Sequence, residues 1–243
     1  MPEYMAYRKR MQSNRSLTIR GTPAEVDVTR KRLCDWLERD VASKLPFLLP
    51  PPGHAKRATA VENLRGLKLL DLMYMIAVLQ EVHGVPAFPT KMQSYKGAVQ
   101  YRRPSQSMLY ATNKVPSYLA LVPSREPDSG LGIVNACKDR IPRDEVLGYY
   151  IGIIMTVAQG ERLAYKKHNA YIMFVKGPNN RRQYAINARD RTLSTWTRFV
   201  NESREPGGLA NTAFMESVET KDLITVTSIK DIRPGEELLL SYR

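Results

Sequence analysis

The sequence has few of the residues that hold metal ions or form disulfides. Its 243 residues include two cysteines, Cys34 and Cys137, and three histidines, His54, His83 and His168. Two cysteines so far apart in sequence make neither a disulfide framework nor a zinc cluster, and a reducing compartment is the simplest interpretation. Three scattered histidines do not make a histidine-rich metal site. We therefore predict no metal ligand in this chain.

Long apolar runs, internal repeats and low-complexity tracts are also missing. No apolar run approaches the roughly 20 residues that a membrane-spanning helix needs, so no membrane segment is expected. Hydrophobic residues make up 43% of the chain and charged residues 25%, which are ordinary values for a globular protein. The length is sufficient for one large domain or two modest ones, each with a core of its own.

Net charge is the compositional feature that departs from the ordinary. Lys and Arg number 37 against 24 Asp and Glu, a net charge of +13. Residues 1–127 hold 20 basic and 10 acidic residues, a net of +10, and residues 128–243 hold 17 and 14, a net of +3. This asymmetry favours a front half that docks on an anionic partner, nucleic acid or an assembly that contains it. The alternative is a basic surface that is merely solvated.

The front half has the sequence signals of helices. Residues 1–21 are rich in cations and indicate a basic arm, or part of a mitochondrial transit peptide. Residues 22–25 form a capping box with proline at the first helical position, which predicts a helix that ends before Pro46. One stripe of this helix is apolar and forms its expected core face: Val26, Leu33, Trp36, Leu37 and Val41.

A second helix is expected after a stiff, proline-rich connector at residues 46–53. Residues 59–62 form another capping box, and we predict one helix from there to His83, closed by Gly84 and Pro86. Because leucine, methionine, isoleucine and valine leave this helix little polar face, it should be buried against a partner. We assign residues 22–100 to a basic helical region.

From about Tyr101 the sequence becomes rich in short β-forming segments separated by Gly, Pro, Asn and Asp. The expected fold class is α+β, with the helical region followed by a β-rich domain over residues 101–243. The predicted strand segments are residues 117–123, 132–136, 146–156, 170–175, 183–186 and 223–229.

A series of short motifs crosses the β-rich half. Each is weak alone: glycines before a strand usually make a tight turn, and a terminal tyrosine is usually a strand-end aromatic. In chain order they are Gly130 and Gly132, Tyr149-Tyr150-Ile151-Gly152, Ile186-Asn187-Ala188, Arg198-Phe199-Val200-Asn201-Glu202-Ser203, and Gly235-Glu236-Glu237-Leu238 followed by Tyr242.

In this order and spacing the motifs resemble the SET domain of protein lysine methyltransferases, over about residues 123–243. The stretch from Trp196 to Asn201 is similar to the PR-domain subclass. The resemblance implies a pseudoknot, in which the C-terminal strand threads the Asn201 loop and forms the pocket for S-adenosylmethionine. It also implies a narrow channel in which the substrate lysine meets the methyl group.

The resemblance assigns site roles to six residues and supporting roles to three more. Gly130 and Gly132 would let the backbone approach the cofactor, and Asn201 would hydrogen-bond it, with the Glu202 carboxylate beside the pocket. Tyr242 would line the transfer channel, with Tyr150 as an auxiliary aromatic next to it. Arg198 and Phe199 are expected to brace the loop, and Trp196 to pack.

The implied function is S-adenosylmethionine-dependent lysine methylation of a histone or another basic protein, in the nucleus. Three departures favour an alternative. Glu202 stands where the family usually has histidine, residues 204–210 lengthen the loop, and the given chain stops one residue after Tyr242, without a following segment to cover the channel. The N-terminal region would then supply the cover, or the channel is open, or catalysis is lost. The alternative is a SET-derived structural subunit of a ribonucleoprotein, a chromatin complex or a virion, with the mitochondrion as the other compartment.

Overall fold

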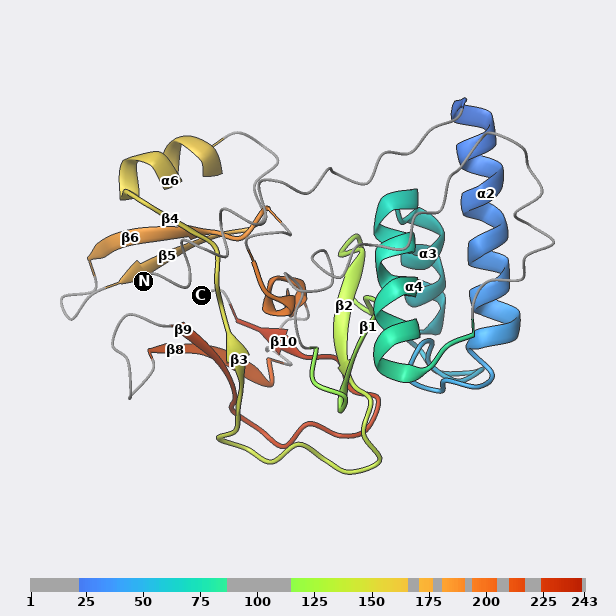
Figure 1. The fold of residues 1–243 in the computed structure, drawn as a ribbon. Helices are drawn as coiled ribbons and strands as arrows, with labels where there is room; N and C mark the ends of the chain where they lie inside the picture. Colours follow the sequence, from blue (N-terminus) through green and yellow to red (C-terminus); the bar gives the residue numbers. More distant parts are fainter. Residues whose placement is uncertain are drawn as a thin grey trace.

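The computed structural model describes seven stretches of the chain: residues 22–86, 115–165, 171–176, 181–190, 194–204, 210–216 and 224–241. Three helices stand at one side of the molecule and pack on a two-stranded ribbon (Figure 1). The remaining strands form a five-stranded and a three-stranded sheet on the other side of this ribbon. The predicted α+β architecture, helices first and strands after, is confirmed.

Helix α2 (Pro23–Trp36) begins at the predicted capping box. The Thr22 hydroxyl accepts a hydrogen bond from Glu25 N at 3.3 Å, and the Glu25 carboxylate accepts one from Thr22 N at 2.8 Å. The helix continues as a wider π-helical turn, Leu37–Val41, and its predicted apolar stripe is buried or partly buried.

The prediction of one continuous helix from residue 59 to His83 is wrong, because the structure contains two helices there. Helix α3 (Arg57–Gly66) begins before the expected cap, and α4 (Leu69–His83) follows it. Glycine has a low helix propensity, and Leu67 turns extended (ψ 136°) and places its side chain in the core. Helix α4 ends, as predicted, at Gly84 in the left-handed conformation (φ 65°).

Helix α4 is apolar on all sides because it packs both on α2 and on strand β1 (Leu119–Pro123). Strand β1 is buried throughout and pairs antiparallel with β2 (Leu131–Asn135). A single hydrophobic core therefore runs from the helices through the ribbon to the C-terminal segment. No helix in the described part of the chain is long and apolar enough to cross a bilayer.

The two larger sheets follow most of the predicted strand segments. The five-stranded sheet has the order β3 (Val146–Tyr149), β9 (Ile224–Ser228), β8 (Thr212–Glu216), β10 (Leu239–Leu240), β7 (Asn201–Glu202). The three-stranded sheet has the order β4 (Ile153–Met155), β6 (Arg182–Asn187), β5 (Ile172–Lys176).

Helix α6 (Val157–Ala164) packs on β5 and β6 and was not predicted. It nevertheless has a sequence signal, since Thr156 and Gln159 form a third capping box.

Two of the sequence motifs meet between β4 and β6. A Cβ atom added to Gly152 would lie 2.5 Å from the Asn187 carbonyl oxygen, so only glycine fits there without moving the backbone. The Tyr-Tyr-Ile-Gly and Ile-Asn-Ala motifs are thus two sides of one contact.

The C-terminal segment is enclosed on both sides. Strand β10 lies between β7 and β8 and runs parallel to both, with Leu239 opposite Asn201 and Leu240 opposite Thr212. Just before it, Leu238 N donates to Ile133 O of β2 at 2.8 Å. Because β7 and β8 follow one another in sequence, the C-terminal strand is inserted into the Asn201 loop, as predicted.

Candidate functional site

The centre of the site is the buried carboxylate of Glu237, which lies two residues before β10 in sequence. It is 4% exposed, and no described Lys or Arg forms an ion pair with it. Its Oε1 accepts from Ser124 Oγ at 2.7 Å and from Asn201 Nδ2 at 3.2 Å, and its Oε2 accepts from Arg125 N at 2.6 Å. Three segments that are far apart in sequence therefore meet at one side chain.

Burial and hydrogen bonding act on Glu237 in opposite directions. Removal of the carboxylate from water raises its pKa, and the hydrogen bonds from Arg125, Ser124 and Asn201 lower it. Burial is the larger effect, so the pKa of Glu237 lies above its ordinary value.

The two glycines at the start of β2, Gly130 just before it and Gly132 within it, are explained by contacts and backbone conformation inside the protein. A Cβ atom at Gly132 would lie 2.2 Å from Glu237 Oε1, so the bare backbone at Gly132 makes room for this carboxylate. Gly130 has a φ of +67°, in the left-handed region that favours glycine. The predicted contacts of Gly130 and Gly132 with a cofactor stay predictions.

Asn201 is held by its amide nitrogen. Besides the bonds to Glu237 and to Ser124 Oγ (3.2 Å), Nδ2 donates to Leu131 O at 2.9 Å. Its Oδ1 has no hydrogen-bond partner among the described residues, so the side chain offers a fixed acceptor from the start of β7.

Glu202 follows Asn201 in β7, and successive strand residues point to opposite faces of a sheet. Its half-buried carboxylate makes no hydrogen bond or ion pair with another described residue. Asn201 and Glu202 thus offer oxygen acceptors from one short strand, on different faces.

Asn211 secures the inserted strand from the far end of the same loop. Its Nδ2 donates to Glu237 O at 2.8 Å, and its Oδ1 accepts from Leu239 N at 2.9 Å. The two bonds hold the backbone on either side of Leu238 and so help to fix the register of β10 between β7 and β8.

Tyr150 lies in a second, smaller core away from Glu237. Its hydroxyl donates to Tyr171 O at 3.3 Å, and its ring packs edge-on against Phe214 at a centroid distance of 5.0 Å. Tyr150 is therefore anchored at both ends of its side chain, and its predicted role as an auxiliary aromatic of the channel stays a prediction.

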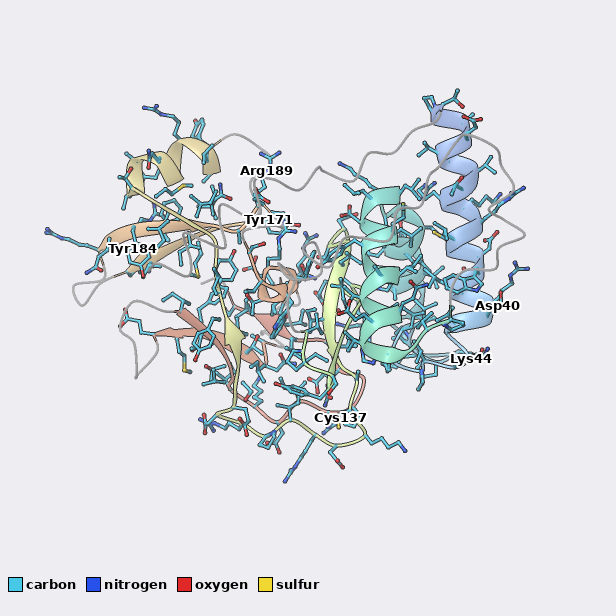
Figure 2. All side chains as sticks on the ribbon, viewed as in Figure 1. Asp40, Lys44, Cys137, Tyr171, Tyr184 and Arg189 are labelled. Atoms are coloured by element: carbon cyan, nitrogen blue, oxygen red, sulfur yellow. The ribbon has the colours of Figure 1, made fainter. Side chains whose placement is uncertain are left out.

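Arg198 joins this second core to the Asn201 loop. Its guanidinium lies 4.1 Å from the centre of the Tyr171 ring and donates from Nε to Ala188 O (2.8 Å) and from Nη2 to Arg189 O (3.0 Å). Figure 2 places Tyr171 and Arg189 together at the end of the three-stranded sheet nearer the helices. Arg198 Nη1 is buried and has no hydrogen-bond partner among the described residues, and burial lowers the pKa of the Arg198 guanidinium.

Tyr242 lies outside the described residues, so its place in the channel stays a prediction. Glu237 and Ser124 were not predicted as site residues. The Gly-Glu-Glu-Leu motif contains Glu237 and could have pointed to it, whereas Ser124 carries no sequence signal of its own.

Comparison with known proteins identifies the domain in the C-terminal part of the chain. The family model of the SET domain matches residues 130–243. Residues 130–243 are a SET domain. This confirms the resemblance found in the sequence, and the SET domain is the fold of protein lysine methyltransferases.

The solved structures that resemble the chain include three SET domains. The methyltransferase domain of human PR domain-containing protein 2 is 26% identical, with 54% of this chain and 80% of that chain covered and a TM-score of 0.43. The SET domain of the RIZ1 tumor suppressor is also 26% identical. The match covers 56% of this chain and 76% of that chain, with a TM-score of 0.41. The Neurospora SET domain protein DIM-5, a histone lysine methyltransferase, is 22% identical. The match covers 51% of this chain and 52% of that chain, with a TM-score of 0.39. No curated protein sequence matches the chain.

SET domains typically bind S-adenosylmethionine, and the residues around the inserted strand fit this cofactor. Its ammonium and adenine amino groups are hydrogen-bond donors, and its sulfonium is positive. Asn201 Oδ1 and the Glu202 carboxylate are the acceptors that the described SET domain leaves without a partner at β7. Acceptors of this kind complement a ligand rich in donors and positive charge.

The raised pKa of Glu237 predicts a specific pH dependence of stability. Because the folded-state pKa lies above the unfolded value, Glu237 contributes stability below about pH 4.5 that is lost as pH rises through the folded pKa. Glu237→Gln should remove this contribution. Urea titrations measure the difference in free energy of unfolding, wild type minus variant, at each pH. This difference should decline above pH 4.5, and a difference that rises with pH would contradict a raised pKa of Glu237.

Proposed function

We propose that this chain is an S-adenosylmethionine-dependent protein lysine N-methyltransferase that acts on a histone or another basic protein. One observation carries the proposal: Asn201 is fixed through Nδ2 by Glu237, Ser124 and Leu131, while its Oδ1, beside the inserted strand, has no partner among the described residues. An amide held in this way presents an acceptor of defined direction to a ligand.

The chemistry asks for alignment more than for strong acids or bases. The bound cofactor would supply an activated methyl group on a sulfonium, with the neutral thioether as its leaving group, and an uncharged lysine nitrogen would be its acceptor. The protein therefore has to hold donor and amine in register and to favour the uncharged amine by removing water from it. In this proposal Asn201 hydrogen-bonds the cofactor, and the backbone at Gly130 and Gly132 lies beside it. Glu202, whose side chain leaves β7 on the opposite face, acts on the positively charged cofactor through the negative charge of its carboxylate.

Tyr242 and Tyr150 take the lysine side of the proposal. A tyrosine hydroxyl can orient an amine and accept from it without carrying charge at neutral pH. Tyr242 follows the inserted strand by two residues in sequence, and Tyr150 has its hydroxyl fixed to Tyr171 O. We propose Tyr242 as the residue at the transfer point and Tyr150 as its aromatic neighbour.

The second candidate function is a SET-derived structural subunit without catalysis, in a nucleic-acid-containing assembly. Glu202 in place of histidine and the lengthened loop favour it. The positive charge fits either candidate, since the excess is concentrated in two segments. Residues 1–21 carry a net of +4 and residues 87–114 a net of +5, whereas residues 22–86 carry +1. Both candidates share an anionic partner bound through these basic segments, in the nucleus or, for a ribonucleoprotein, in the mitochondrion.

The first test is cofactor binding. Wild type should bind S-adenosylmethionine or its demethylated product in calorimetry, and Asn201→Ala should weaken binding by about 1–3 kcal/mol, the cost of an orphaned hydrogen-bonding group. Gln159→Ala removes a surface amide that only caps α6 and is the matched control. Absence of wild-type binding at millimolar cofactor would end the enzyme proposal.

The second test separates the enzyme from the structural subunit. Tyr242→Phe keeps the ring and removes the hydroxyl, so cofactor affinity should hardly change, whereas methylation of a lysine peptide should slow by about 100-fold or more. Methyl transfer from labelled cofactor measures the rate. A wild-type protein that binds cofactor but methylates no protein in nuclear, mitochondrial or whole-cell extracts would favour the structural subunit.

The third test addresses the anionic partner with the full chain. Replacement of the five cations of residues 87–114 by glutamine should lower affinity for RNA or DNA and flatten its dependence on salt, by up to about 0.9 in log–log slope for each lost phosphate contact. Anisotropy of a labelled oligonucleotide measures both. A control variant changes five exposed cations of the SET domain: Lys138, Arg140, Arg143, Arg162 and Arg181. Equal losses of oligonucleotide affinity in the two variants would show that the net charge of the whole chain, and not residues 87–114 in particular, is responsible for binding.

A further inference from the structure

A chain of hydrogen bonds leads from helix α3, outside the SET domain, to Asn201. Its first part is Glu126, in the turn between β1 and β2, which is 1% exposed. The Oε1 of Glu126 pairs with Lys56 Nζ at 2.9 Å, and its Oε2 accepts from Arg204 N at 3.1 Å. One buried carboxylate thus connects the start of α3 to the loop that follows Asn201.

Asn63 makes a second connection from the same helix. It is 8% exposed, and its Nδ2 donates to the carbonyl oxygens of both Ser124 and Glu126 at 2.8 Å. Two bonds from one amide fix the backbone of the turn, because they hold carbonyls two residues apart.

The turn passes this constraint to the site through Ser124. Ser124 Oγ accepts from Glu126 N at 3.0 Å, donates to Glu237 Oε1, and lies within hydrogen-bonding distance of Asn201 Nδ2. A shift of the turn would therefore change the two partners that set the direction of the Asn201 amide.

The position of Lys56 is itself unusual. It is the N-cap of α3, makes no side-chain cap, and places a cation at the positive end of the helix dipole. Such a cation is unfavourable there, and its pairing with a carboxylate that needs a charged partner offsets the cost.

We propose that Lys56, Asn63 and Glu126 are positioning residues of the cofactor site, by which helix α3 sets the orientation of Asn201. The inference rests on the proposed function. It makes the helical region part of the site rather than a separate docking module. Since coupling is reciprocal, cofactor binding should also stabilise the contact of α3 with the turn.

The test compares three full-length variants. Lys56→Met removes the partner of Glu126, and Lys56→Arg keeps a cation there. Arg65→Met, also in α3, breaks an exposed ion pair with Glu38 of the π-helical turn. Calorimetry measures the cofactor dissociation constant, and hydrogen exchange measures protection of the Arg204 amide. Lys56→Met should raise the dissociation constant about tenfold, since the lost pair is partly buried, and should speed exchange at Arg204. Lys56→Arg should restore both, and Arg65→Met should alter neither.

The two readouts separate this inference from the proposed function. If wild type binds no cofactor, the proposed function fails, while exchange at Arg204 still tests the coupling. If Lys56→Met leaves the dissociation constant and the exchange at wild-type values, the inference is overturned. Should Lys56→Met not fold, Lys56→Met with Glu126→Gln leaves no unpaired buried charge and carries the same measurements, and wild-type values there overturn the inference as well.

Discussion

The fold around the candidate site depends on keeping one carboxylate, Glu237, away from water. A buried carboxylate that forms no close ion pair within the described residues has to be surrounded by donors, and these come from Ser124, the Arg125 backbone and Asn201, with a further electrostatic contribution from the Arg125 guanidinium. The same requirement explains why Gly132 has no side chain. Because Glu237 immediately precedes the inserted segment, satisfying its oxygens also fixes where the C-terminal strand enters between β7 and β8.

The helical region and the SET domain are joined in two physically different ways. Apolar packing of α4 on β1 forms a continuous core, which supplies most of the stabilisation but little direction. The polar contacts of α3 with the turn are few and directional, and they act on the residues next to Asn201. Packing therefore decides that the helices are attached, and hydrogen bonding decides the geometry that they impose.

The sequence predicted the features that are encoded locally or by motif. The capping box at Thr22, the left-handed end at Gly84 and most strands depend on neighbouring residues, and the SET motifs located the inserted strand. The break between α3 and α4 was missed for two reasons. The capping signal at residues 59–62 predicted a single helix start, and burial of the Leu67 side chain, which accompanies the extended backbone there, depends on residues far away in sequence. The Ser124–Glu237 contact, across 113 residues, has no local signal at all.

In the proposed function, Asn201 serves the fold with one atom and would offer the other to a ligand. Its Nδ2 helps to satisfy the buried Glu237, so the protein has reason to keep Asn201 whether or not it catalyses. The direction of Oδ1 follows from those same bonds, which means that a cofactor gains a preorganised acceptor at no further cost in ordering. A ligand that binds this acceptor in the native state adds RT ln(1 + [L]/Kd) to stability. Because Asn201 pairs with Leu239 in the sheet, a ligand bound at Oδ1 in the proposed way would oppose any opening of the sheet in which the inserted strand leaves β7.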